Sequence, residues 1–148
     1  MGFFPNFALE AEGHHCLNTM FMINTRGGVS PWFLLGVLNS SATRVFWLDR
    51  FWDRRRTFPK IKGTYSKALP LPGYGDSQVE ELAQLMTKYW SSHATATDAS
   101  RRAHLERAME ATQHSLDVRV LELFGLGGDH AAALNDFVDA TVPKGTRR

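Results

Sequence analysis

A run of cations lies between Arg44 and Lys67, where eight lysines or arginines stand against two acidic residues. Five aromatic residues are interleaved with them between positions 47 and 65. Guanidinium and ammonium groups donate hydrogen bonds to phosphate oxygens, and arginine also donates a pair to guanine O6 and N7. Exposed aromatic rings stack on bases. The chemistry that this segment offers is therefore the binding of a polyanion, with nucleic acid as the first candidate.

The candidate contact residues share a cationic or aromatic side chain in or near this segment. They are Arg26, Arg44, Arg50, Trp52, Arg54, Arg55, Arg56, Lys60, Lys62, Tyr65 and Lys67. Trp47 and Phe51 are predicted to pack in the core, whereas Trp52 and Tyr65 are equally compatible with packing and with stacking on bases. An ordinary solvated face is the alternative explanation of the whole run.

The formal net charge of +2 conceals an uneven distribution along the chain. Residues 1–43 carry −1, residues 44–67 carry +6, residues 68–140 carry −6, and the remaining residues carry +3. A concentrated positive segment attracts a polyanion even when the whole molecule is nearly neutral. The sequence therefore predicts one anion-binding face rather than a generally basic protein.

Residues suited to catalysis or metal binding are few. His14 and Cys16 would share one face of a strand, but His15 would point to the other, and the chain has no second cysteine to complete a zinc site. The glycine-rich residues 125–129 follow a helical pattern and not a strand, so they are explained better as a helix stop than as a phosphate loop. We predict no catalytic residue and no metal ligand.

The bulk composition fits one globular domain. The chain has 148 residues, of which 43% are hydrophobic, enough to bury a core. Its longest apolar runs are far shorter than the ~20 residues that span a bilayer, so no membrane partner is expected. The single cysteine cannot form an intrachain disulfide, which favours a cytoplasmic location.

The first half of the chain is predicted to contain a small sheet and one buried helix. Residues 16–25 are rich in β-formers and would form a hairpin with residues 7–9. Ser30, followed by a proline, is a good helix start, and the apolar stripe behind it continues to position 48 with an interruption near residues 39–41. Gly36 weakens this helix unless another backbone packs closely against it.

The second half is predicted to be helical. A capping box at Ser77 begins one helix, and the polar residues 91–100 separate it from the next. Apolar residues between 105 and 123 recur at steps of four and three, which is typical of a helix-pairing seam. Gly125 has the form of a helix C-cap, and a short helix over 129–140 follows.

Together these patterns predict an α+β fold with two regions. Residues 1–75 would form a DNA target-recognition lobe that is β-rich, with one helix and a basic loop. Residues 76–148 would form a helical part that docks on the lobe or on another domain. The oligomeric state is not determined by the sequence.

Four features resemble a known family, the TaqI-like C-terminal specificity domain of type II restriction–modification enzymes and related adenine methyltransferases. Asn18-Thr19 correspond to the Asn-Thr near the end of the family's strand, and the other three are longer stretches. Residues 34–40 (LLGVLNS) are similar to the family's helix, and residues 58–72 (FPKIKGTYSKALPLP) to its Phe-Pro-Lys-Ile loop. Residues 116–126 (LDVRVLELFGL) look like its Ile-Asp-x-x-Val-x-x-Leu-Tyr-Gly-Leu helix, with Phe124 at the Tyr position.

The resemblance implies a division of labour with the rest of a longer enzyme. Parent enzymes of this kind transfer a methyl group from S-adenosylmethionine to adenine N6, and many carry a nuclease that uses Mg²⁺. The Asn-Pro-Pro-Tyr and Phe-x-Gly-x-Gly motifs of such parents do not occur in this sequence. The resemblance thus implies that this chain binds no cofactor itself and is not an enzyme alone.

The leading hypothesis is a sequence-specific recognition domain for double-stranded DNA, a C-terminal fragment of a bacterial restriction–modification enzyme with an upstream methyltransferase domain as its partner. Base chemistry inside a duplex requires flipping, so a separate surface must hold the flanking DNA. The alternative is a helical protein–protein docking module in which the basic loop is incidental.

Overall fold

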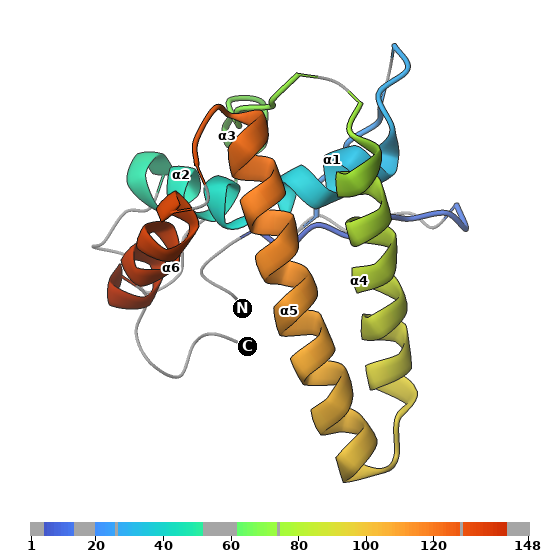
Figure 1. Ribbon diagram of the computed structural model, residues 1–148. Coiled ribbons are helices and arrows are strands. Elements are labelled where there is room, and N and C mark those ends of the chain that lie inside the picture. Colours follow the sequence, from blue (N-terminus) through green and yellow to red (C-terminus); the bar gives the residue numbers. More distant parts are fainter. Residues whose placement is uncertain are drawn as a thin grey trace.

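The computed structural model describes residues 5–13, 20–25, 27–51, 62–73, 75–127 and 129–141, with the backbone alone at positions 135 and 139. Within these residues the regular structure is helical. The helices are α1 (Pro31–Leu38), α2 (Ser41–Phe51), α3 (Gly63–Ser66), α4 (Ser77–Thr95), α5 (Ala99–Leu123) and α6 (Asp129–Thr141). α4 and α5 form a long antiparallel hairpin that extends away from the other helices (Figure 1).

The prediction of an α+β fold with a small β-sheet lobe is wrong. The described parts of the chain contain no strand, and residues 20–25 run as an irregular segment. A β-forming sequence gains stability from a hydrogen-bonded neighbour and from a packed face. The apolar side chains of residues 20–23 are all exposed, so this segment lacks such a face. Residues 14–19, which include the first four residues of the predicted second strand, lie outside the described residues.

The start of α1 and the interruption behind it are confirmed. Ser30 Oγ accepts a hydrogen bond from the Phe33 nitrogen at 3.4 Å, and Pro31 takes the first helical turn, where its missing N–H costs nothing. α1 ends at Leu38, and α2 begins at Ser41 after a break of two residues. The predicted single stripe is therefore carried by two helices.

The main core cluster joins α1, α4 and α5. Phe33 and Val37 from α1 pack with Val79 from α4 and with Leu116 and Val120 from α5. These five side chains are at most 2% exposed, and full burial of such a side chain contributes about 1.5–3 kcal/mol. The two predicted regions of the chain thus share one core.

Gly36 brings α1 and α4 into close contact. A β-carbon built at Gly36 would lie 2.6 Å from Val79 Cγ1 and 3.3 Å from Leu116 Cδ1. Real β-carbons do not come within 3.0 Å of another carbon, so only glycine fits without a shift of the neighbours. This confirms the expectation that a glycine inside this helix requires a closely packed neighbour.

The N-cap of α4 lies one residue earlier than predicted. Asp76 has the extended backbone of a cap, and its Oδ1 accepts a hydrogen bond from the Val79 nitrogen at 3.0 Å. Ser77, the predicted cap, is the first residue inside the helix. Both residue types cap well, and the carboxylate of Asp76 is the one that also finds a cationic partner, described below.

The gap between α4 and α5 is shorter than predicted. α4 continues to Thr95, so most of the polar residues 91–100 are helical. Asp98 then caps α5 by accepting a hydrogen bond from the Arg101 nitrogen at 2.7 Å. Small polar side chains lower helix propensity only modestly, and here they lie mostly on exposed or half-buried positions, where they need no apolar partner.

The end of α5 is as predicted. Gly125 has a φ of 76°, and its nitrogen donates to the Glu122 carbonyl at 2.9 Å. The Leu126 nitrogen donates to the Leu121 carbonyl at 2.9 Å, which completes a Schellman-type cap. The predicted last helix follows as α6, which packs against α2 and α5.

Candidate nucleic-acid interface

The predicted contact residues divide into two groups. Those outside the described residues are Arg26, Trp52, Arg54, Arg55, Arg56 and Lys60. Those that the structure places are Arg44, Arg50, Lys62, Tyr65 and Lys67. The first two of these lie on α2, and the other three lie on or beside α3.

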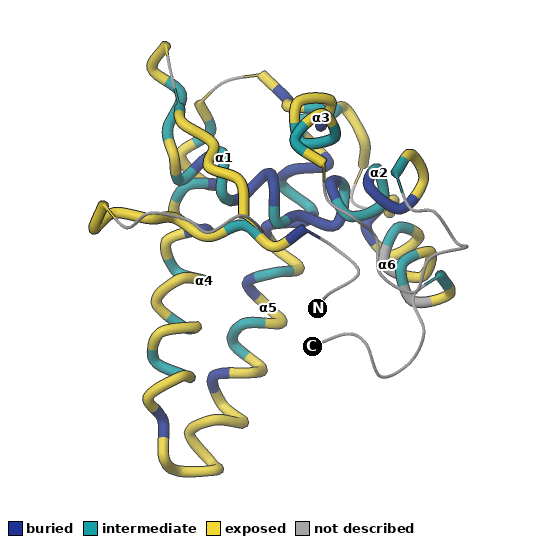
Figure 2. The backbone as a smooth tube through the Cα atoms, turned by 180° about the vertical axis from the view of Figure 1, so that it is seen from behind, coloured by how far each residue is buried: buried dark blue, intermediate teal, exposed yellow. Residues whose placement is uncertain are grey.

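Three of the placed cations are exposed on neighbouring elements. Arg50 is in the last turn of α2, Lys62 is the N-cap of α3, and Lys67 follows that helix directly. Figure 2 shows α3 in the foreground, with α2 on one side of it and the chain that leads into α1 on the other. Asp49 lies 3.5 Å from Arg50, but both side chains are about two-thirds exposed, so solvent screens this pair.

Arg44 has a different environment. Arg44 is half-buried. Burial lowers the pKa of its guanidinium, and the negative charge of Asp117 only partly opposes this. A cation that faces a buried carboxylate is held inside the protein by that charge. Arg44 is therefore less suited to phosphate contact than Arg50.

The aromatic residues of the segment that the structure describes pack against one another. The ring of Phe51 stacks on that of Tyr65 with centroids 4.4 Å apart, and Trp47 lies 5.9 Å from Tyr65 in an edge contact. Trp47 is 0% exposed and belongs to a second core cluster with Leu38 and Leu69. Packing is thus confirmed for Trp47 and Phe51. Tyr65 is half-buried, and its ring lies 5.6 Å below the Lys62 ammonium, a weak cation–π contact.

A buried polar cluster at the break between α1 and α2 was not predicted from the sequence. Asp117, on α5 and 3% exposed, accepts hydrogen bonds at Oδ1 from the Ser41 nitrogen at 2.7 Å and from Gln113 Nε2 at 2.9 Å. Burial raises the pKa of this carboxyl, and its hydrogen bonds and Arg44 only partly oppose that rise. The only sign of this cluster in the sequence was that an acidic residue, Asp117, directly follows Leu116 of the apolar seam.

Asn39 ties the N-terminal segment to the same break. Its Nδ2 donates to the Phe7 carbonyl at 3.0 Å and to the Leu35 carbonyl at 3.1 Å, and its Oδ1 accepts from the Phe7 nitrogen at 3.2 Å. Gln113 Nε2 also lies 3.3 Å from the Asn39 carbonyl. The two-residue break is thus bonded to both the N-terminal segment and α5.

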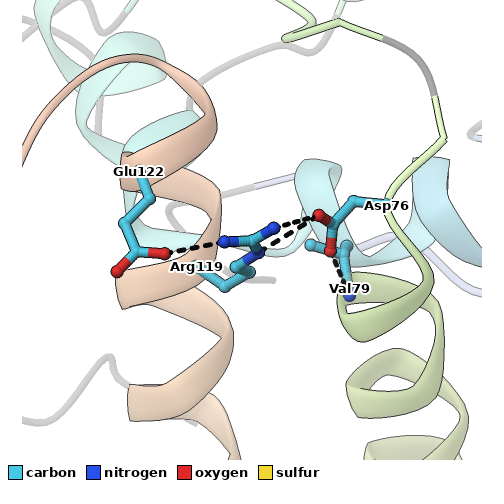
Figure 3. Close-up of polar contacts among 4 residues, drawn as sticks. All are labelled: Asp76, Val79, Arg119 and Glu122. Atoms are coloured by element: carbon cyan, nitrogen blue, oxygen red, sulfur yellow. Dashed lines mark hydrogen bonds and ion pairs between the residues drawn. The ribbon is translucent and has the colours of Figure 1, made fainter.

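A second polar contact fixes the start of α4 against α5 (Figure 3). Arg119 Nε donates to Asp76 Oδ2 at 3.1 Å, and Arg119 Nη1 donates to Glu122 Oε2 at 2.9 Å. The hydrogen bond from Arg119, more than that from the Val79 nitrogen, lowers the pKa of the Asp76 carboxyl. The positive charge of Arg119 is thus neutralised by two carboxylates of the protein itself.

A groove of about 290 Å³ opens beside Lys67. Residues 23–25 form one wall, α1 contributes apolar side chains, and residues 66–71 form the other wall. Asn24, Thr25 and Ser66 supply hydrogen-bonding groups in it, and none of the described residues that line it is acidic. The groove therefore suits a neutral or anionic group.

The described residues offer no metal centre and no helix suited to a membrane. No three His, Cys, Asp or Glu side chains come together among them. His14, His15 and Cys16 lie outside the described residues. None of the helices in the described part of the chain is both long and apolar enough to cross a bilayer.

Residues 3–71 match the family model of the TaqI-like C-terminal specificity domain. The match includes the motif at 34–40 and nearly all of that at 58–72, and so confirms the resemblance for this segment. The third similar stretch, residues 116–126, lies beyond the matched range. No curated protein and no solved structure matches the chain.

Proposed function

Because residues 3–71 belong to the TaqI-like C-terminal specificity domain family, we propose that the chain is a sequence-specific recognition module for double-stranded DNA. The parent would be a bacterial type II restriction–modification enzyme or N6-adenine DNA methyltransferase that acts in the cytoplasm, where the DNA lies. Catalysis would belong to an upstream methyltransferase domain, so this chain alone is not an enzyme. DNA and that domain are the partners we propose.

The observation that carries the proposal is the set of exposed cations that the structure places within the matched segment. Arg50, Lys62 and Lys67 come from consecutive elements and are all exposed, while the nearby aromatic rings are packed as their support. Phosphate contacts hold a duplex in register, and base contacts then supply specificity. Asn24 in the groove beside Lys67 carries the amide that pairs with adenine N6 and N7.

S-adenosylmethionine does not fit the groove in this chain. Lys67 lines the groove and the other described lining residues are neutral, whereas the cofactor carries a sulfonium cation and ribose hydroxyls that acidic residues usually bind. We propose that the cofactor, and Mg²⁺ if the parent also cleaves DNA, bind elsewhere in the parent enzyme.

A second candidate function is protein docking by the α4–α5 hairpin. Trp90 on α4 is 61% exposed, and large exposed aromatic residues are common anchors of interfaces. Docking on the upstream domain and binding of DNA would use different parts of the molecule, so both functions are compatible with one parent. A concentration-dependent dimer without duplex affinity would favour docking alone.

The test is fluorescence anisotropy of the chain against a mixed-sequence duplex, the matched single strand and heparin, each over a salt series. We expect a duplex preference and a log–log salt slope of about −0.9 per phosphate neutralised. The triple variant Arg50→Ala, Lys62→Ala, Lys67→Ala should weaken duplex binding at least tenfold and make the slope shallower by about 2–3.

The matched control removes the same charge elsewhere. Lys88 on α4 and Arg101 and Arg107 on α5 are exposed, and their triple alanine variant has the same net charge as the test variant. We expect the control to keep nearly all duplex affinity. Equal losses in the two variants would show that only net charge matters, and wild-type binding to heparin as strong as to duplex would argue against DNA recognition.

A further inference from the structure

The start of α2 is buried, so its backbone nitrogens need protein acceptors. Ser40, the residue before the helix, and Ser41, its first residue, are at most 2% exposed. Ser40 Oγ accepts from the Thr43 nitrogen at 3.4 Å, and Asp117 Oδ1 accepts from the Ser41 nitrogen at 2.7 Å. Unpaired buried N–H groups are costly, so both acceptors are needed to hold this helix end in place.

Asp117 belongs to α5 and not to the segment that it caps. Its carboxylate is 76 positions away from Ser41 in sequence, and Gln113, one turn earlier on α5, donates both to that carboxylate and to the Asn39 carbonyl. A negative charge at a helix N-terminus also interacts favourably with the helix dipole. α5 therefore binds both sides of the break between α1 and α2.

This contact holds the first residue of α2, so any shift there is carried along the helix. Arg50 is nine residues beyond Ser41, which is about 13 Å along the helix axis. A rotation of about 10° at Ser41 would therefore move Arg50 by about 2 Å, which is enough to lose a phosphate hydrogen bond. The basic residues of the following segment continue the chain from this same helix.

We infer that Asp117 is a positioning residue for the DNA-binding face: it fixes the start of α2 against α5 and so sets the direction in which α2 carries its cations. This inference rests on the proposed function. It assigns to the C-terminal helical part a role in recognition, in addition to any docking, although Asp117 lies outside the matched residues 3–71.

The test compares three single variants of the full chain. Asp117→Ala removes the acceptor, Asp117→Asn keeps an oxygen that can accept from the Ser41 nitrogen, and Glu110→Ala removes an acidic charge from an exposed site on the same helix. The readouts are amide hydrogen exchange in α2 and the salt slope of binding to a mixed-sequence duplex. A variant that is only partly folded has fewer active molecules, but those that bind keep the wild-type salt slope. A variant with misplaced cations has a shallower slope. The salt slope therefore separates positioning from simple destabilisation.

We expect Asp117→Ala to speed exchange at the first amides of α2 at least tenfold and to make the salt slope shallower by about 1–2, corresponding to one or two lost phosphate contacts. In Asp117→Asn, the exchange rate of these amides and the salt slope should both lie within about twofold of the wild-type values. Glu110→Ala should change neither the exchange rate nor the salt slope. If Asp117→Ala lacks helical circular dichroism, Gln113→Ala replaces it, with an expected threefold loss of duplex affinity.

Two results would overturn the inference. One is a folded Asp117→Ala with the wild-type salt slope, and the other is a Gln113→Ala, used in its place, with wild-type affinity. Failure of the proposed function looks different, because then the wild type itself shows no duplex preference. In that case the exchange data still report whether Asp117 fixes α2.

Discussion

Gly36 on α1 lies against Val79 on α4 so closely that a β-carbon at position 36 would be 2.6 Å from Val79 Cγ1. In an exposed helix, Gly→Ala stabilises by about 1 kcal/mol, because alanine has the higher helix propensity. Here we expect the opposite sign: Gly36→Ala should lower the free energy of unfolding by about 1–3 kcal/mol through overpacking. Denaturant unfolding followed by circular dichroism measures it.

Gly127 is the matched control for this substitution. A β-carbon there would meet no atom within 4 Å, and its φ is not in the left-handed region. Gly127→Ala should therefore be neutral or slightly stabilising. A Gly36→Ala variant at least as stable as the wild type would show that the two helices separate easily.

The contact between Asp76 and Arg119 predicts a loss of stability in acid. Arg119 lowers the pKa of Asp76 below its ordinary 3.8 in the folded state, so the contribution is present above that value and lost as the pH falls through the folded pKa. The difference in unfolding free energy between wild type and Arg119→Gln should shrink between pH 5 and pH 2. Arg107→Gln, exposed on the same helix, serves as control, and a pH-independent difference would contradict the assignment.

Asp117 predicts the opposite dependence on pH. Burial raises the folded pKa of this carboxyl above 3.8, so its contribution is largest below that value and is lost as the pH rises through the folded pKa. Relative to Asp117→Asn, the wild type should lose stability as the pH rises from about 3 to neutrality. The measurement is denaturant unfolding over this range with Glu110→Gln as control, and a constant difference would refute the prediction.

The stacked pair of Phe51 and Tyr65 predicts that Tyr65 acts mainly by packing. Tyr65→Phe should leave both stability and duplex affinity nearly unchanged, because the ring supplies the contact. Tyr65→Ala should cost about 1–2 kcal/mol of stability. Thermal unfolding and anisotropy together check this, and a tenfold loss of duplex affinity in Tyr65→Phe would instead assign the hydroxyl a DNA contact.

The helices could be predicted from the sequence because their signals are local. The cap at Ser30, the apolar steps along α5 and the stop at Gly125 each depend on residues within one or two turns. The strand prediction for residues 20–25 failed because β-structure depends on a partner, and β-propensity alone does not supply one. The cap of α4 was misplaced by one residue because Asp76 and Ser77 are both good caps.

The part of the candidate site that could be predicted is its charge and the packing of Trp47 and Phe51, whereas the packing of Tyr65 was left open. Arg50, Lys62 and Lys67 are exposed as a basic surface requires, and Trp47 is buried as expected. The contact between Asp117 and Ser41 could not be predicted, because it joins residues 76 positions apart and depends on how α5 lies against the break. The position of a residue in the pattern of one helix does not show which other helix its side chain will contact.

The contact from Asp117 to Ser41 also bears on how much of the chain must be kept together in a transplant. The family match ends at residue 71, but the acceptor for the buried start of α2 and three of the five side chains of the main core cluster come from α4 and α5. A chimera that transplanted only the matched residues would leave Ser41 uncapped and Phe33 uncovered. The smallest segment that keeps these contacts therefore extends through α5.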